Sequence, residues 1–176
     1  MATTNWALDA MHSELQFKVK HMMISNVTGS FTKFEATVTT EGDDFSTAKI
    51  SFSADVDSIN THNEQRDGHL KSPDFFDVAN HPKITFEGTQ MEKVSDEDYK
   101  LHGNLTMHGV THPVVLAVTY GGTSKDPYAN IRAGFELQGK INRKDFGLVY
   151  NAILETGGVA LSEEVRIHAN IEFIKG

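Results

Sequence analysis

Apolar and polar residues alternate with a period of two along most of the chain. This alternation is typical of β-strands with one face in the interior and one in solvent, because successive side chains of a strand point to opposite sides. Eight stretches follow the pattern, at residues 15–20, 34–39, 50–57, 84–87, 101–108, 114–120, 133–141 and 165–173. The sequence therefore predicts an all-β protein of about eight antiparallel strands.

Turn-forming residues separate the predicted strands, for example Gly42-Asp43, Gly109 and Gly121-Gly122. The chain has 176 residues, which is the length of one domain, so we expect residues 1–176 to form a single unit. A sheet with one apolar face is stable as a sandwich or as a closed up-and-down barrel, and closure removes exposed strand edges.

The alternation stops after the third predicted strand. Residues 63–70 are expected to form a short helix capped near Thr61 or Asn63, within a long connection between two central strands. Phe75 and Phe76 follow outside any predicted strand. Two adjacent aromatic residues in a connection indicate a plug or lid over the core.

The inward faces of the predicted strands combine large and small residues, such as Phe17 and Phe34 with Ala36 and Gly103. An eight-stranded barrel has an interior that is filled by its own side chains or holds one small ligand. The small residues would let neighbouring side chains interdigitate, or would leave a channel. The alternation alone leaves both interpretations open.

Charge and composition exclude several classes of partner. The formal net charge is -8, which argues against a nucleic-acid partner and against docking on an anionic membrane. No apolar run approaches the length of a transmembrane helix, so no stable membrane insertion is expected. The N-terminus lacks the basic and apolar regions of a signal peptide. We expect a cytoplasmic protein, or a periplasmic or secreted one if the sequence is a processed form.

Motifs of enzymes and metal sites are also missing from the sequence. There is no cysteine, no G-x-S-x-G elbow, no GxGxxG and no P-loop, so we do not expect an enzyme or a bound cofactor. Nine histidines are present, and His102, His108 and His112 lie near one another in sequence. A zinc site needs three close ligands, and this spacing does not favour one. We expect surface histidines and no metal site.

Motifs in a fixed order run through nearly the whole chain. They include D-A-M-H-S-E-L-Q-F at 9–17, R-D-G-H-L at 66–70, D-F-F-D at 74–77, G-N-L-T at 103–106 and I-N-R-K-D-F-G at 141–147. In this order and spacing they resemble the YceI-like family of lipid-binding barrels.

The resemblance implies a lipocalin-like barrel with a polyisoprenoid or similar long-chain amphiphile along its axis. It also implies frequent dimers, so a homodimer is expected. Many family members carry a signal peptide and are periplasmic, and this chain departs from that pattern. We expect a binding protein for a polyisoprenoid, an isoprenoid quinone or a fatty amide, acting in lipid carriage, storage or stress protection.

Candidate ligand contacts are inward-facing residues and residues of the helix and plug, each of which could instead be ordinary core. They are Phe17, Val19, His21, Phe34, Phe52, Val56, Leu70, Phe75, Phe76, Phe86, Leu105, Leu116, Phe135 and Phe146.

Polar candidates for a ligand head group are less clearly marked. Ser13 and His21 share the inward phase of the first predicted strand, and a buried hydroxyl or imidazole needs a hydrogen-bond partner. That partner is a ligand head group, the backbone or Asp9. The structural alternative is favoured.

Arg66 and His69 lie on the predicted helix beside the plug. Arg66 suits a ligand phosphate through its forked donors, or it ties the helix to Asp74 or Asp77, and the structural role is again favoured. The motif at 142–145 is expected to clasp a turn, with its arginine held by a carboxylate.

Two alternatives to a lipid-binding protein remain open at this point. An enzyme acting on an apolar substrate at the barrel mouth predicts a strained or pKa-shifted group in the cavity lining. A ligand-free interaction module predicts a solid interior and an exposed apolar patch.

Overall fold

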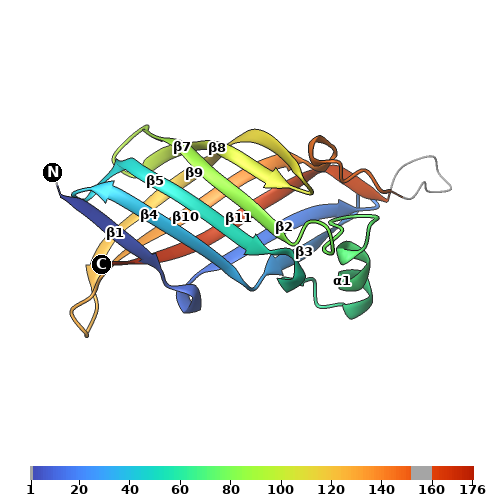
Figure 1. Cartoon of the computed structure of the whole chain (residues 1–176), viewed down its shortest axis with the longest axis horizontal. Helices are drawn as coiled ribbons and strands as arrows, with labels where there is room; N and C mark the ends of the chain where they lie inside the picture. Colours follow the sequence, from blue (N-terminus) through green and yellow to red (C-terminus); the bar gives the residue numbers. More distant parts are fainter. Residues whose placement is uncertain (1, 152–159) are drawn as a thin grey trace.

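A computed structural model describes residues 2–151 and 160–176. In this part of the chain, eleven strands form one antiparallel sheet, accompanied by one α-helix and three 3₁₀ helices (Figure 1). The strands are β1 (Thr3–Leu8), β2 (Glu14–His21), β3 (Ser25–Phe31), β4 (Phe34–Glu41), β5 (Asp44–Asp55), β6 (Ile59–Asn60), β7 (Lys83–Lys93), β8 (Asp98–Met107), β9 (Val110–Lys125), β10 (Ile131–Asn142) and β11 (Leu161–Lys175). The helices are α1 (Glu64–Lys71), η1 (Ala10–His12), η2 (Val56–Ser58) and η3 (Arg143–Phe146).

Eight strands form a closed ring in the order β1-β4-β5-β7-β8-β9-β10-β11. The ring closes because β1 pairs with β4 on one side and with β11 on the other. In the closing pair, Trp6 lies opposite Lys175 and Leu8 lies opposite Phe173. The predicted eight-stranded antiparallel barrel is therefore confirmed.

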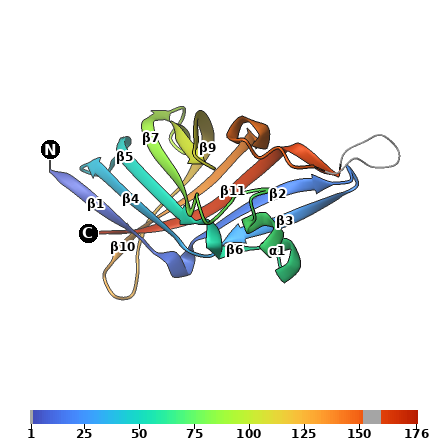
Figure 2. The same ribbon diagram turned by 45° about the vertical axis from the view of Figure 1, so that its right-hand side comes forward.

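The barrel changes character along its length. Beyond the end of β1, the same edge of β11 pairs with β2, and β3 and β6 continue the sheet from there. Helix α1 lies beside β3 and β6, at the end of the barrel opposite the two termini (Figure 2). Within the described residues, no helix has the length and apolar character needed to cross a membrane.

The predicted strands correspond to β2, β4, β5 and β7 to β11. The prediction missed β1, β3 and β6, and it placed β2 in the ring where the structure has β1. The third predicted strand also ran too far, because Val56 and Asp57 belong to η2. The helix is confirmed, and the Asn63 side chain caps it by accepting a hydrogen bond from the Arg66 backbone at 3.0 Å.

Aromatic rings fill the barrel at the end near the termini. Phe45 is the centre of this cluster, with its ring centroid 5.0 Å from Trp6, 5.1 Å from Tyr120 and 4.9 Å from Phe135. The indole Nε1 of Trp6 donates a hydrogen bond to the Thr40 hydroxyl at 3.0 Å, so the buried polar atom is satisfied. This end of the barrel is closed by side chains.

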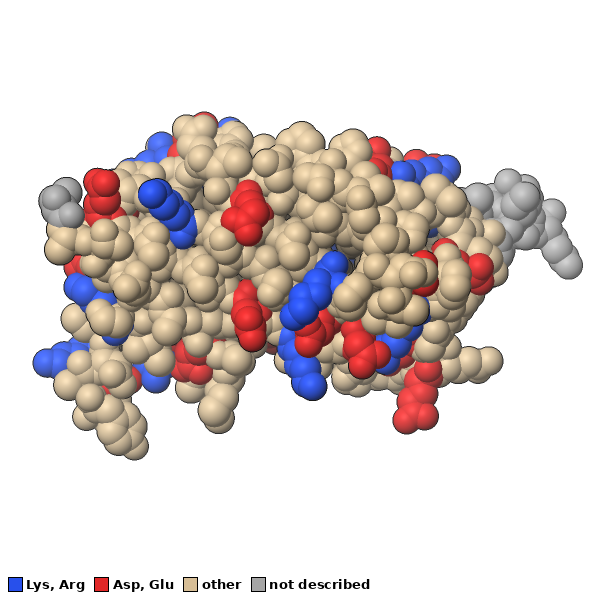
Figure 3. Space-filling model, viewed as in Figure 1, with Lys and Arg blue, Asp and Glu red and all other residues tan. Residues whose placement is uncertain are grey.

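The outer surface carries the polar phase of the strands. On the face shown in Figure 3, Lys and Arg are interspersed with Asp and Glu over a mostly uncharged surface. Several of these charges form ion pairs, including Lys83 with Asp55 at 2.8 Å and Lys144 with Glu163 at 2.8 Å. Exposed pairs of this kind each contribute only about 0–1 kcal/mol, so the apolar interior dominates stability.

Arg132 on β10 joins two connections near the closed end. Its Nε donates to the Asp126 carboxylate at 2.8 Å and its Nη1 donates to Asp9. Asp9 follows β1 and Asp126 follows β9, so the guanidinium ties the closing strand to the β9–β10 connection. Hydrogen bonds from Arg132 lower the pKa of Asp126 to about 2, and those from Arg132 and then His12 lower the pKa of Asp9.

We expect the Asp126–Arg132 pair to make stability fall in acid. The pKa of Asp126 drops from its ordinary value of 3.8 to about 2 on folding, so its stabilising effect is complete above pH 4. That effect is lost as the pH falls from about 4 to about 2. Urea unfolding of the wild type, D126N and the exposed-site control D96N should show a smaller loss over this interval for D126N alone. Identical pH profiles for all three proteins would contradict this assignment.

Candidate ligand-binding cavity

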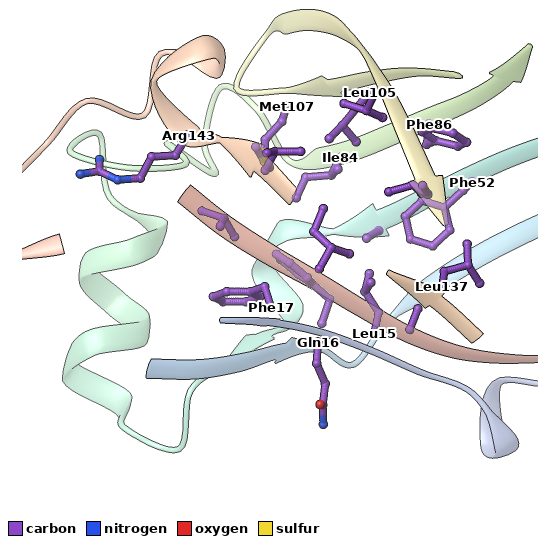
Figure 4. A pocket seen from close by; sticks show the side chains of 18 of the residues that line it. Leu15, Gln16, Phe17, Phe52, Ile84, Phe86, Leu105, Met107, Leu137 and Arg143 are labelled. Carbon is purple, nitrogen blue, oxygen red and sulfur yellow. The ribbon is translucent and has the colours of Figure 1, made fainter. Parts of the chain in front are cut away.

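A cavity of about 570 Å³ lies inside the barrel. Inward side chains of the strands line it, together with residues of α1 and of the segment 72–82 (Figure 4). Its volume is within the range of ligand pockets, roughly 300–1,000 Å³. The sequence pattern did not decide between a filled and a hollow interior, and the structure has a hollow one.

Small inward residues keep the interior hollow. A Cβ atom on Gly29 would lie 2.3 Å from the Phe17 ring, and one on Gly103 would lie 2.3 Å from the Phe86 ring. Each phenylalanine therefore lies against the wall, over a glycine, and does not extend across the barrel axis. A side chain larger than hydrogen at either glycine would push the ring into the cavity.

The two ends of the cavity differ in polarity. The aromatic cluster described above closes one end, where Phe45 and Phe135 belong to the lining. At the other end the lining includes polar side chains from the end of β2, from α1 and from η3 and the residues after it. In Figure 4, Arg143 lies at this α1 end, and Gln16 points away from the cavity.

Arg143 is the most buried charged group at the polar end, at 4% exposure. Its Nε donates to the Ser162 carbonyl at 2.9 Å, and its Nη1 donates to the carbonyls of Leu148 and Tyr150. The remaining nitrogen, Nη2, is buried and has no hydrogen-bond partner in the described part of the chain. Burial lowers the pKa of Arg143, while the neighbouring Glu163 raises it.

The expectation that a carboxylate holds this arginine is wrong for the described residues, because backbone carbonyls hold it. A buried donor without a partner costs about 1–3 kcal/mol, and more when it is charged. In the part of the chain that the structure describes, Arg143 therefore has a charged donor without a partner, and the residue belongs to the cavity lining.

Three rings pack together at the same end. The His69 ring lies 5.1 Å from Phe75 and 5.0 Å from Tyr150, and Phe75 lies 5.2 Å from Tyr150. The Nε2 atom of His69 is 2.9 Å from the Asp74 carboxylate. These contacts connect α1 to the segment that follows it and to Tyr150, which lies just after η3 in the sequence.

Arg66 also belongs to the lining, but its hydrogen bonds differ from those expected. Nε and Nη2 donate to the hydroxyl and carbonyl oxygens of Thr61 at 2.8 and 2.7 Å. Thr61 in turn donates to Asp67. Arg66 thus fixes the start of α1, and its hydrogen bonds go to Thr61 in place of the expected Asp74 or Asp77.

The structure brings most of the candidate residues together in the cavity lining. These residues are Phe17, Val19, His21, Phe52, Leu70, Phe75, Phe76, Phe86, Leu105, Leu116 and Phe135, with the head-group candidates Arg66 and His69.

Four candidates lie outside the lining. Val56 and Phe146 are each 1% exposed and are core residues of η2 and η3, and Phe34 packs with its ring centroid 5.9 Å from that of Phe52. The Ser13 hydroxyl donates to the Asp9 carbonyl at 2.7 Å and accepts from the Glu172 backbone at 3.0 Å. Ser13 therefore joins η1 to β11 and does not face the cavity.

Sequence reasoning also missed several lining residues. Val27 and Phe31 lie on β3, and Phe45 lies at the start of β5, outside the stretches with clear alternation. Arg143 was assigned to a turn clasp, and Tyr150 was not considered. No sequence signal marks the contacts of Arg143, because its partners are the backbone carbonyls of Leu148, Tyr150 and Ser162.

Exposed apolar side chains lie next to the polar end of the cavity. Met23 and Ile24, in the turn that follows His21, are 61% and 84% exposed. Val149, beside the lining residues Leu148 and Tyr150, is 61% exposed. An apolar molecule approaching this end would therefore meet apolar surface before it reaches the interior.

Comparisons with known proteins agree with this geometry. A family model described as a YceI-like domain matches residues 6–173. The UPF0312 protein SA2479 of Staphylococcus aureus (strain N315) is 42% identical over 171 residues, which is 97% of each chain.

Solved structures show the same fold. BcnA of Burkholderia cenocepacia has a TM-score of 0.81 at 21% identity, covering 94% of this chain and 98% of its own. The Campylobacter jejuni YCEI protein has a TM-score of 0.77 at 31% identity, covering 88% of each chain. A polyisoprenoid binding domain from Saccharophagus degradans, implicated in plant cell wall breakdown, has a TM-score of 0.68 at 18% identity, covering 97% of this chain and 98% of its own. Because the family model spans nearly the whole sequence and the barrel agrees with it, this protein belongs to the YceI-like family.

Proposed function

We propose that this protein binds a long-chain apolar molecule of the polyisoprenoid type, with its chain in the cavity and its head group at the α1 end. The observation that carries the proposal is the apolar cavity of about 570 Å³ inside a closed barrel. The Saccharophagus degradans structure described as a polyisoprenoid binding domain supports the ligand class. The role would be carriage, storage or protection of the lipid, without chemical conversion.

The energetics favour a hydrocarbon occupant. Apolar cavities tend to exclude water, so an unfilled interior leaves its lining without contacts. Each Å² of apolar ligand surface moved from water into this lining contributes about 25 cal/mol. A flexible chain with many carbon atoms gains this energy along its whole length, which favours a long and slender ligand.

The polar end supports an oxygen-bearing head group. Among the described residues, the Nη2 atom of Arg143 is a buried donor without an acceptor, and the rings of His69 and Tyr150 lie at the same end. A phosphate, a quinone carbonyl or an amide carbonyl would each accept a hydrogen bond from the guanidinium. Polyprenyl phosphates, isoprenoid quinones and fatty amides share this chemistry.

The two alternatives receive less support from the geometry. A solid interaction module predicts no continuous internal cavity, and the described residues enclose one. An enzyme at the barrel mouth predicts a pKa-shifted group in the lining, and the pKa of Arg143 is lowered. Because a guanidinium stays protonated near neutral pH, this shift does not provide a general base or acid.

Extraction of the purified protein tests the proposal directly. Organic extraction followed by mass spectrometry should release a long-chain isoprenoid or fatty species in about equimolar amount. Protein obtained empty should take up an isoprenoid quinone or a polyprenyl phosphate in a fluorescence or calorimetric titration. Empty protein that takes up neither compound would refute the proposal.

Filling the cavity should block binding. Ala36 on β4 lines the cavity, and Thr37 beside it faces solvent. We expect A36F to weaken quinone binding at least tenfold, or about 1.4 kcal/mol, because its ring occupies the place of the chain. The matched control T37F adds the same ring on the outer face and should bind as the wild type does. Equal binding by A36F and T37F, with both proteins folded by circular dichroism, would place the ligand elsewhere.

Replacing Arg143 should separate head-group binding from chain binding. A hydrogen bond to a charged group contributes about 1.5–3 kcal/mol, so R143K should weaken the binding of a polyprenyl phosphate about 10- to 100-fold. Squalene has no head group, and its binding should change less than about threefold. Because Arg143 also holds backbone carbonyls, melting curves must show that R143K folds. Equal losses for both ligands would mean that the arginine has a structural role only.

A further inference from the structure

Asp77, His81 and His108 come together behind the wall of the cavity. A carboxylate oxygen of Asp77 and one ring nitrogen from each histidine lie within 4.8 Å of one another. The two imidazole rings are 4.9 Å apart at 66°, and all three residues are half-buried. In the described residues, no ion pair joins Asp77 to a lysine or an arginine.

Two separate parts of the fold build this cluster. Asp77 and His81 belong to the segment 72–82, where the His81 backbone donates to the Asp77 carbonyl at 2.8 Å and so brings both side chains close. His108 lies in the turn between β8 and β9. A Cβ atom on the next residue, Gly109, would lie 2.8 Å from the His81 ring, so this glycine leaves room for the imidazole.

Hydrogen bonds orient the donor atoms. The Nδ1 atom of His108 is 3.2 Å from the Phe146 carbonyl, which can only accept, so Nδ1 carries the hydrogen and Nε2 carries the lone pair. A histidine that binds a metal commonly donates its other ring N–H to a carbonyl in this way. The Asn80 side chain donates to the Asp77 carboxylate at 2.8 Å and fixes its orientation.

We propose that Asp77, His81 and His108 bind a divalent transition-metal cation, with Zn²⁺ as the best-suited ion. Two imidazoles and one carboxylate form a common zinc ligand set that leaves a fourth position for water. Zinc–ligand bonds of about 2.0–2.2 Å require donor atoms roughly 3–3.5 Å apart. Side-chain rotations would have to bring the donor atoms closer together than the separations of up to 4.8 Å in this structure.

A second cluster provides an internal comparison. Asp9, His12 and Glu172 also bring their donor atoms within 4.8 Å of one another. Here the Arg132 guanidinium already contacts Asp9 and lies 3.7 Å from Glu172, so a cation of the protein itself occupies the site. Within the described residues, the cluster around Asp77 has the donor atoms and no lysine or arginine paired with Asp77.

A metal ion at this site would cross-link the part of the cavity wall that the segment 72–82 forms outside the sheet. Phe76 and Met107, which immediately precede Asp77 and His108, both line the cavity. A bound cation would therefore join the segment 72–82 to the β8–β9 turn directly behind the lining. Its binding depends on these three side chains and not on a lipid, so it stands apart from the proposed function.

Titration of tag-free, chelator-treated protein with ZnCl₂, without added lipid, tests this proposal. Calorimetry should show one Zn²⁺ per chain. Loss of a residue that only hydrogen-bonds a metal ligand weakens metal binding roughly 10- to 100-fold. H81A and H108A each remove a ligand, so each should weaken Zn²⁺ binding by at least that factor. The matched control H12A, from the cluster occupied by Arg132, should bind as the wild type does. Zn²⁺ should also slow hydrogen exchange in residues 72–82 of the wild type and H12A.

Co²⁺ gives a readout on the unmutated protein if a variant fails to fold. Because the chain has no cysteine, a visible absorption band of four-coordinate Co²⁺ that Zn²⁺ displaces would report a site built from nitrogen and oxygen ligands. The absence of stoichiometric Zn²⁺ binding and of this band would overturn the proposal. Binding that H12A weakens as much as H81A does would also overturn it.

Discussion

The structure depends on one geometric constraint, the closure of an eight-stranded sheet around inward side chains too small to fill it. Eight strands enclose a space just wide enough for packed side chains or for one slender ligand. Gly103 on β8 favours the second outcome within the ring, because it lets the Phe86 ring lie along the wall, and Gly29 does the same for Phe17 where β2 and β3 continue the sheet. Closure also leaves the ring without exposed strand edges, so access to the interior is confined to its ends.

The difference between the two ends gives the cavity a direction. Rings packed around Phe45 close one end, where the Trp6 indole already donates its hydrogen bond to Thr40. At the opposite end, Arg143 holds three carbonyls and, among residues 2–151 and 160–176, retains one buried donor without a partner. An apolar residue at this position would leave these carbonyls without a donor, so Arg143 holds the backbone around the end of the cavity as well as bordering the cavity itself.

Local alternation predicted most of the sheet, because it reports directly which face of a strand is buried. It missed β1, where only Trp6 and Leu8 are large apolar residues in a six-residue strand, and β3, where Gly29 interrupts the inward face. The cavity wall was largely predictable for the same reason. The contacts of Arg143 were not predictable, because its partners are backbone carbonyls, which no residue type marks in a sequence.

The wall of the cavity is held in two different ways. Over most of its circumference, a ladder of backbone hydrogen bonds joins neighbouring strands, and opening it would break several bonds at once. Where α1 and the segment 72–82 complete the wall, side-chain contacts replace the ladder, including the rings of His69, Phe75 and Tyr150. Regions with fewer cooperative backbone bonds open at lower free energy. Ligand exchange is therefore expected at this end, where the polar groups and the exposed apolar residues also lie.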